Sequence, residues 1–451
     1  MEIARKKIDL VMYRAYTALE SKGVGMSAIS DHTLRYQLAN ELHARPFPTL
    51  TAPCRAAFLA IKRPENAAAR DREADRAHLI ALLDRNGAAH PPPGATHYFG
   101  SLGRYQLKWE SHTEFVTYTL FSDGVADIPF DGSTFDMFPV DWLTEAPGER
   151  ITSALIRVER ATSDDAVPDG LEQWFVPESM AVSRVLDGTA IIAGDFRIDQ
   201  NGHMRFAMFA RPEMGDRRIG RVVQRICEIE TYKTMSMLGL SRSRELGAKM
   251  GAIDGKLTEL MSDMTSDSAK PDETLKSLLD VSAELESLLA RSSFRFGATK
   301  AYETLVNQRI EVLREKRFNG RQTFAEFMMR RFDPAMRTVR ATEAQLQSMA
   351  ERAERAANLL RTRVDVERSA QNQDLLASMD SRADLQLRLQ RTVEGFSVAA
   401  ISYYAVNLLS YLAYPVFEPL GLSKGMGLFI LTPIVLVMVW LAVQRMKKRV
   451  E

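Results

Sequence analysis

The chain of 451 residues is long enough to form more than one folded domain. Its 59 basic residues nearly balance its 58 acidic residues, so no overall positive charge favours nucleic acid and we expect no nucleic-acid partner. Cys54 and Cys227 are the only cysteines, which excludes a disulfide framework and a multi-cysteine zinc or iron–sulfur site.

The first half of the chain predicts an α+β cytoplasmic domain over residues 31–212, preceded by an N-terminal extension over residues 1–30. Apolar residues at helical spacing predict helices over Asp31–Leu42 and Ala67–Asn86. Short segments rich in β-branched and aromatic residues predict the strands Cys54–Lys62, His97–Leu102, Tyr105–Glu110, Glu114–Phe121, Ile151–Glu159, Ser183–Leu186, Thr189–Ile198 and Met204–Phe209. Asp187-Gly188 indicates a two-residue hairpin.

From Gly215 the composition changes, and we expect helices without strands in a helical domain over residues 213–333. The predicted helices are Arg217–Met237, Ser243–Met264, Asp272–Leu289 and Thr299–Lys316. Residues 334–394 then predict one long stalk helix, because a single glycine lies between Pro334 and Pro415. A short heptad seam within it should pack on the preceding helices or on copies of itself, and comprises Leu346, Met349, Ala353, Ala356 and Leu360.

The last part of the chain contains two uncharged runs, over residues 395–417 and 425–443. Each is long enough to cross about 30 Å of hydrocarbon, so we predict a transmembrane hairpin with a periplasmic loop over 418–424 and a basic tail over 444–451. Basic residues flank the hairpin on its outer ends and keep both termini cytoplasmic. The sequence thus predicts a multi-pass protein of the bacterial inner membrane, in contact with the lipid bilayer.

Polar side chains follow one face of the first predicted span. Tyr403, Asn407, Ser410 and Tyr414 recur at spacings of four, three and four, which places them on one side of a helix. Polar groups in hydrocarbon are costly unless they meet partners or water. This stripe therefore either joins helices through hydrogen bonds or lines an ion path in an oligomer.

Two groups of residues are candidates for a ligand or partner site in the α+β domain. Glu110, His112 and Glu114 alternate along an extended segment, which is typical of a solvent-exposed strand face but also offers two oxygens and a nitrogen to a metal. His43 and Arg45 stand at the end of a helix beside a proline-rich turn. These two residues either stabilise the local structure or bind a phosphate or carboxylate group.

Several sequence motifs of enzymes are absent. The chain has no Walker-type or dinucleotide-binding glycine loop, no HExxH pair and no G-x-S-x-G nucleophile elbow. We therefore expect no enzymatic activity and no organic cofactor, and the sequence assigns no metal.

Two segments carry a resemblance to a known family: His43-Ala44-Arg45-Pro46-Phe47-Pro48 and Trp109-Glu110-x-His112-Thr113-Glu114-Phe115. Together with the C-terminal hairpin, they resemble a family of uncharacterised bacterial membrane-anchored proteins. The resemblance covers nearly the whole chain. It implies a membrane location and no particular activity.

The order of the predicted parts is similar to that of CorA-type magnesium transporters, and Ala405-Val406-Asn407 is the counterpart of their Gly-Met-Asn motif. The segment Arg221-x-x-Gln224-Arg225-x-x-Glu228-x-Glu230-x-Tyr232 resembles the helical layer of sporulation-type relatives. The CorA resemblance implies a homo-oligomer, a pentamer by analogy, and a divalent cation such as magnesium. One hypothesis is therefore a CorA-like cation channel or transporter, and the alternative is a membrane-tethered cytoplasmic scaffold or sensor.

Overall fold

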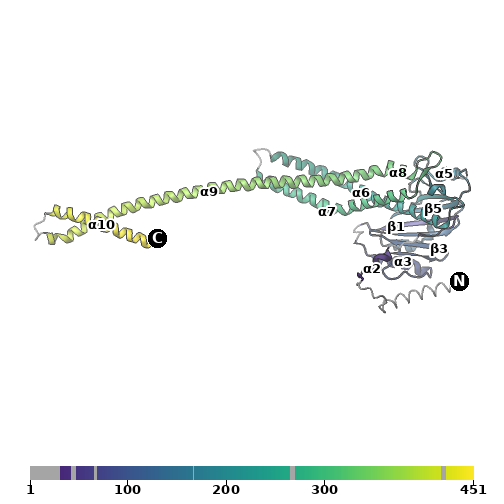
Figure 1. The fold of residues 1–451 in the computed structure, drawn as a ribbon, viewed down its shortest axis with the longest axis horizontal. Coiled ribbons are helices and arrows are strands. Elements are labelled where there is room, and N and C mark those ends of the chain that lie inside the picture. Colours follow the sequence, from purple (N-terminus) through teal and green to yellow (C-terminus); the bar gives the residue numbers. More distant parts are fainter. Residues whose placement is uncertain are drawn as a thin grey trace, which may run out of the picture. The chain divides into compact units, whose positions relative to one another are not determined.

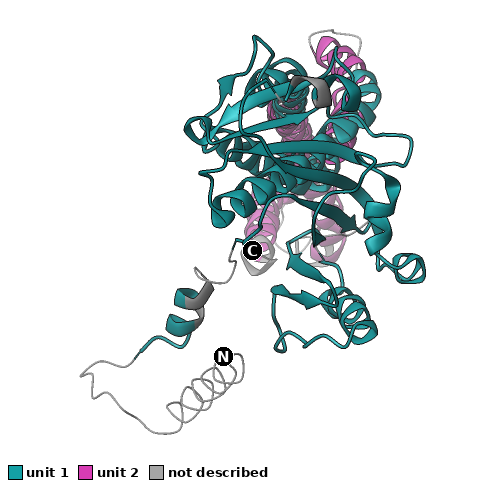
Figure 2. Cartoon of the chain, turned by 90° about the vertical axis from the view of Figure 1, so that its right-hand side faces the viewer, with its two compact units in different colours: residues 1–253, 285–349 teal, residues 254–284, 350–451 magenta. Residues whose placement is uncertain are grey.

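The computed structural model describes residues 31–41, 47–64, 69–165, 167–264, 270–417 and 423–450. The backbone divides into two compact units, which Figure 2 shows in different colours. Unit 1 combines the residues up to Ile253 with Leu285–Met349, and unit 2 combines Asp254–Glu284 with the residues from Ala350 onward. Each unit is therefore assembled from segments that are far apart in the sequence.

Among the described residues, unit 1 contains a nine-stranded sheet in the order β2-β3-β4-β1-β5-β8-β7-β6-β9 (Figure 1). The strands are β1 (Cys54–Lys62), β2 (His97–Leu102), β3 (Tyr105–Ser111), β4 (Phe115–Asp123), β5 (Glu149–Arg160), β6 (Ala181–Val185), β7 (Ala190–Gly194), β8 (Met204–Ala210) and β9 (Lys316–Arg317). The bounds predicted for β1 and β2 are confirmed. The α+β class is confirmed as well, and the sheet is mixed because β5 and β8 run parallel.

Two details of the sheet differ from the sequence-based expectation. We expected no strand after Gly215, but β9 pairs antiparallel with β6. The prediction of a two-residue hairpin at Asp187-Gly188 is also wrong. Val185 pairs with Ala190, and a 3-10 turn, η3 (Leu186–Gly188), lies within the connection. Asp187 has a positive φ of 61° there, a conformation that aspartate tolerates better than most residues.

One face of the sheet is apolar and packs on α3 (Arg72–Arg85) and α4 (Val140–Thr144). The helix α3 begins at Asp71, whose carboxylate accepts hydrogen bonds from two backbone N–H groups of the first turn. Trp109 and Tyr118 from the sheet are fully buried with Leu79 and Trp142 from these helices. Two shorter elements complete this side, namely η2 (Gly132–Met137) and α5 (Pro168–Trp174). The described side chains of α2 (Arg35–Glu41) are exposed.

Two very long helices follow the sheet, α6 (Asp216–Asp263) and α7 (Pro271–Glu311). We predicted two helices in place of each, so both predicted interruptions are wrong. Gly239 lies in the predicted interruption of α6, and a Cβ there would stand 2.4 Å from Oγ1 of Thr299 on α7. The glycine therefore permits the two helices to approach closely and does not end the helix.

After α8 (Phe324–Arg331), whose first turn is fixed by a capping box between Thr323 and Glu326, the chain enters α9 (Asp333–Phe417). This single helix of 85 residues contains the predicted stalk and the first apolar run without interruption. The helix α10 (Lys424–Val450) follows. In the described part of the chain, two helical segments are long and apolar enough to span a membrane, one ending in α9 and one over Gly425–Arg445.

Candidate functional site

A layer of charged side chains lies on the second face of the sheet in unit 1. Side chains alternate along β3, so Lys108 and Glu110 point away from the apolar core that holds Trp109. The residues are only 5% and 8% exposed, because α6 covers this face. Glu114, in the turn after β3, is 1% exposed. The expectation of a solvent-exposed strand face is therefore wrong.

The buried carboxylate of Glu114 is bound by side chains from α7. Both terminal nitrogens of Arg295 donate to its oxygens, and the hydroxyl of Tyr302 donates to Oε1 at 3.1 Å. Burial and the neighbouring Glu114 carboxylate raise the pKa of Tyr302, so this phenol stays protonated. The ring of Tyr302 stacks on Tyr232 of α6 at 5.7 Å between centroids. This arrangement ties the β3–β4 turn to both long helices.

Two further ion pairs lie beside this one, the first within β3 and the second between α6 and α7. Nζ of Lys108 stands 3.0 Å from a carboxylate oxygen of Glu110. On α6, Glu228 accepts a hydrogen bond at 2.8 Å from Nε2 of Gln224 and forms an ion pair with Arg309 of α7. Oε1 of the buried Gln224 has no hydrogen-bond partner in the part of the chain that the structure describes.

A small cavity of about 20 Å³ lies between the sheet and α6, and its lining includes Lys108, Glu110, Gln224, Cys227 and Glu228. A volume of that size holds about one water molecule. A water molecule there would meet a donor in Lys108 and an acceptor in Gln224. The site can bind a group of one or two atoms, and a nucleotide or sugar does not fit.

The described residues contain no group of three metal-binding side chains. In particular, Glu110, His112 and Glu114 do not converge on one point, because Glu114 is held by Arg295 and the ring of His112 stacks on Phe115 at 4.4 Å. The metal-binding interpretation of these three residues is therefore wrong.

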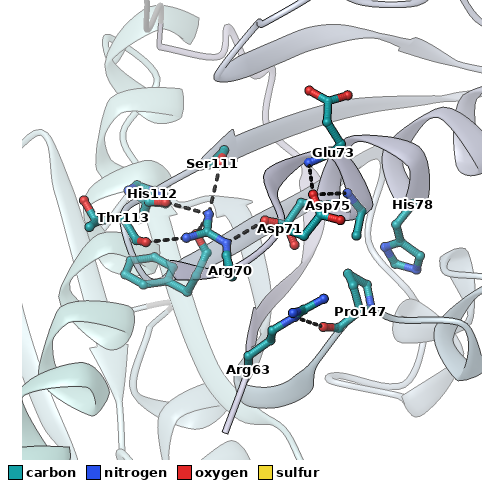
Figure 3. Close-up of polar contacts among 12 residues, drawn as sticks. Arg63, Arg70, Asp71, Glu73, Asp75, His78, Ser111, His112, Thr113 and Pro147 are labelled. Atoms are coloured by element: carbon teal, nitrogen blue, oxygen red, sulfur yellow. Dashed lines mark hydrogen bonds and ion pairs between the residues drawn. The ribbon is translucent and has the colours of Figure 1, made fainter. Parts of the chain in front are cut away.

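A buried arginine that we did not single out from the sequence holds the β3–β4 turn in place (Figure 3). Arg70 donates through Nη2 to the carbonyl oxygen of His112 at 2.6 Å and to Oγ of Ser111 at 3.0 Å, and through Nη1 to the carbonyl oxygen of Thr113. Its Nε donates to Asp75 of α3 at 2.6 Å. The guanidinium thus positions Glu114 for Arg295. Nothing in the local sequence distinguishes this arginine from its exposed neighbours.

The predicted polar stripe lies in unit 2, near the end of α9. Tyr403 and Asn407 are exposed in the single chain, and the half-buried Ser410 donates from Oγ to the carbonyl oxygen of Val406 at 2.6 Å. Among the described residues of this region, the buried ones are instead Ser402 of α9 and Gly427 and Val435 of α10. The side chain of Tyr414 lies outside the described residues, as do His43 and Arg45 from the other predicted site.

The chain combines an α+β unit with long helices and with two helical segments that are long and apolar enough to span a membrane. This combination defines its class of protein. A model of the family described as "Protein of unknown function (DUF3422)" matches residues 30–450, so the chain belongs to this family. The expected membership of an uncharacterised family is confirmed. A search of curated proteins found no match.

Proposed function

We propose that the protein is a homo-oligomer of CorA-like plan in the bacterial inner membrane that passes a cation along the polar stripe of α9. The proposal includes both helices of the hairpin as transmembrane segments, with both termini in the cytoplasm. It includes no enzymatic activity and no nucleic-acid partner. A divalent cation such as magnesium is the first candidate for transport, and a pentamer is the first candidate for the assembly.

The exposure of Asn407 is the observation that carries the proposal. If this part of α9 lies in hydrocarbon, the hairpin leaves the amide of Asn407 and the hydroxyl of Tyr403 uncovered. A polar group facing lipid is costly, so these side chains need another protein chain or water. If copies of α9 face one another, the stripe of each copy contacts the neighbouring chains and the water in a central path.

The order of the elements supports the CorA-like plan. A mixed sheet is followed by two long helices, then by the uninterrupted α9 and by α10 with a basic end. Of the Gly-Met-Asn motif, Asn407 alone matches, after Ala405 and Val406. The proposal therefore concerns a cation path and leaves the selectivity for magnesium to experiment.

Flux measurements test this function directly. Full-length protein reconstituted in liposomes is expected to conduct magnesium, another divalent cation or a monovalent cation, and Asn407→Leu is expected to abolish that flux. Thr432→Val is the matched control, because it removes a polar group from α10 whose hydroxyl is already bonded to the carbonyl oxygen of Leu428. Absence of flux for every cation tested would contradict the proposal.

The alternative function is a membrane-tethered scaffold or sensor, and the cavity beside Gln224 favours it. A buried acceptor without a partner is costly, so a small ligand that donates a hydrogen bond would stabilise unit 1. This alternative predicts that a hydrogen-bond donor of one or two non-hydrogen atoms, such as ammonium, raises the melting temperature of the full-length protein and that Gln224→Leu removes the effect. A protein that conducts cations and shows no such ligand effect would count against it.

A further inference from the structure

The middle of α9 is a fully exposed helix with a wide apolar face. Every residue from Arg368 to Val393 is exposed in the single chain. The apolar side chains among them include Leu375 at 62% and Leu389 at 67% exposure. Apolar side chains left in water on a lone helix are unfavourable, and such a helix is only marginally stable by itself.

The spacing of these residues continues into the polar stripe. Steps of four and three residues define a line on one side of α9, which we call the seam: Leu375, Met379, Arg382, Gln386, Leu389, Val393, Phe396, Ala400, Tyr403 and Asn407. This is the heptad period by which helices pack on one another in coiled coils. The stripe in the apolar run is therefore the extension of a face that begins outside it.

The positions beside the seam are compatible with pairing of identical helices. In a parallel assembly of copies, each seam residue meets its own equivalent, and the positions that flank the seam face the flanking positions of the neighbouring helix, where like charges would repel. The flanking positions are uncharged, namely Leu376, Ser378, Ala383, Leu385, Gln390 and Thr392. Apart from Arg382, the charged residues from Leu375 to Glu394 lie on the other sides of the helix, where Asp384 and Arg388 pair at 3.3 Å.

Within unit 2, α10 leaves the seam residues exposed. It runs beside the end of α9 (Figure 1), and its Val443 lines a hollow with Val398 of α9 and with the seam residues Gln386, Leu389 and Val393. Among the described residues of α9 in this region, Val398, Ser402, Ala405 and Leu409 are buried or half-buried and form a line opposite the seam. Glu394, Val406, Ser410 and Ala413 are half-buried as well, outside that line. The hairpin thus covers the side of α9 opposite the seam, while the side chains of Tyr403 and Asn407 themselves remain exposed.

We propose that α9 helices from copies of this chain pack in parallel along the seam from Leu375 to Asn407, with Arg382 and Gln386 as two successive polar layers that fix their register. A shared membrane orientation makes the helices parallel and aligns their ends. The inference rests on the proposed homo-oligomer and names its interface. Guanidinium groups of Arg382 that meet on the axis repel one another and oppose cation entry, so the closed seam describes a non-conducting state.

Cysteine cross-linking of the full chain in membranes tests the interface. Leu389→Cys, on the seam, is expected to give a disulfide-linked dimer under mild oxidation. Leu387→Cys, at an equally apolar and 54% exposed position off the seam, is the matched control and is expected to give none. The native Cys54 and Cys227 are buried and give little background. Equal cross-linking at both positions, or cross-linking at residue 387 alone, would overturn the proposal.

Three charge substitutions provide a second readout that does not depend on disulfide geometry. Leu389→Arg is expected to reduce the oligomer to smaller species in detergent, while Leu387→Arg leaves it intact. Arg382→Leu is expected to raise the melting temperature of the oligomer because it removes the repelling layer.

If cation flux persists while Leu389→Arg leaves the oligomer unchanged, the seam is wrong and the proposed function stands. If the seam variants behave as expected and no cation passes, the proposed transport fails alone.

Discussion

Glu114 and Arg295 form an ion pair across 181 positions of sequence, with the carboxylate 1% and the guanidinium side chain 17% exposed. The pair joins the β3–β4 turn to α7. Removing one partner of a buried pair leaves the other charge without compensation, which costs about 3–5 kcal/mol. We expect Arg295→Met to lower the free energy of unfolding of unit 1 by about 3 kcal/mol, measured by denaturant titration with tryptophan fluorescence.

The control for this prediction is an exposed pair in the same unit. Arg242 and Glu245 are joined at 3.0 Å with Glu245 61% exposed, and such surface pairs contribute about 0–1 kcal/mol. Glu245→Gln should therefore change the unfolding midpoint only slightly. Similar losses from Arg295→Met and Glu245→Gln would show that burial of Glu114 does not decide the stability.

Two glycines of α6 predict opposite effects of the same substitution. A Cβ on Gly220 would lie 1.8 Å from the carbonyl oxygen of Pro48, whereas a Cβ on Gly251 would meet nothing within 4 Å. Gly220→Ala should destabilise unit 1 by about 1–3 kcal/mol through overpacking. Gly251→Ala should stabilise α6 by up to about 1 kcal/mol, because alanine is the better helix former. Thermal unfolding of both variants checks the prediction, and the same sign for both would contradict it.

His78 makes the stability of unit 1 depend on pH. Its Nε2 donates to the carbonyl oxygen of Trp142 and its Nδ1 accepts from the hydroxyl of Tyr118, both at 3.0 Å, so the neutral ring satisfies both neighbours. Burial lowers the pKa of His78 below its ordinary value of 6.5. As the pH falls through about 6.5, the unfolded chain therefore takes up a proton that the folded chain does not, and stability is lost.

A variant isolates the contribution of this histidine. His78→Gln should be less stable than the parent at pH 8, because it disturbs the two hydrogen bonds, and should lose less stability between pH 7 and 5.5. His203, whose pKa is also lowered by burial, titrates in both proteins and cancels in the comparison. Melting temperatures measured across this pH range provide the test, and parallel curves for the two proteins would refute the assignment.

Elements with a local signal could be predicted from the sequence. The strands Cys54–Lys62 and His97–Leu102 follow from apolar and aromatic runs between turn residues, and α9 follows from a long stretch with a single glycine. The length of α6 could not be predicted, because glycine often interrupts a helix, whereas Gly239 permits close packing of α6 on α7. That distinction depends on Thr299, which lies on another helix.

The candidate site in unit 1 was only partly predictable. Alternating charges from Lys108 to Glu114 look the same on a solvent-exposed strand and on a strand that a second layer covers. Their partners, Arg295, Tyr302 and Arg70, come from other parts of the chain, and no local pattern connects them with the β3–β4 turn. The polar stripe of α9 was predictable because helical spacing alone defines it.

The unbroken backbone of α9 has a mechanical consequence. Val364 is buried and Tyr403 lies in the apolar run, and at 1.5 Å per residue the two are separated by roughly 58 Å of continuous helix. A hydrogen-bonded ladder without a hinge transmits torsion along its length. A small rotation of the helix about its axis near Val364 would therefore change the direction of the Tyr403 side chain, without any other element between the two residues.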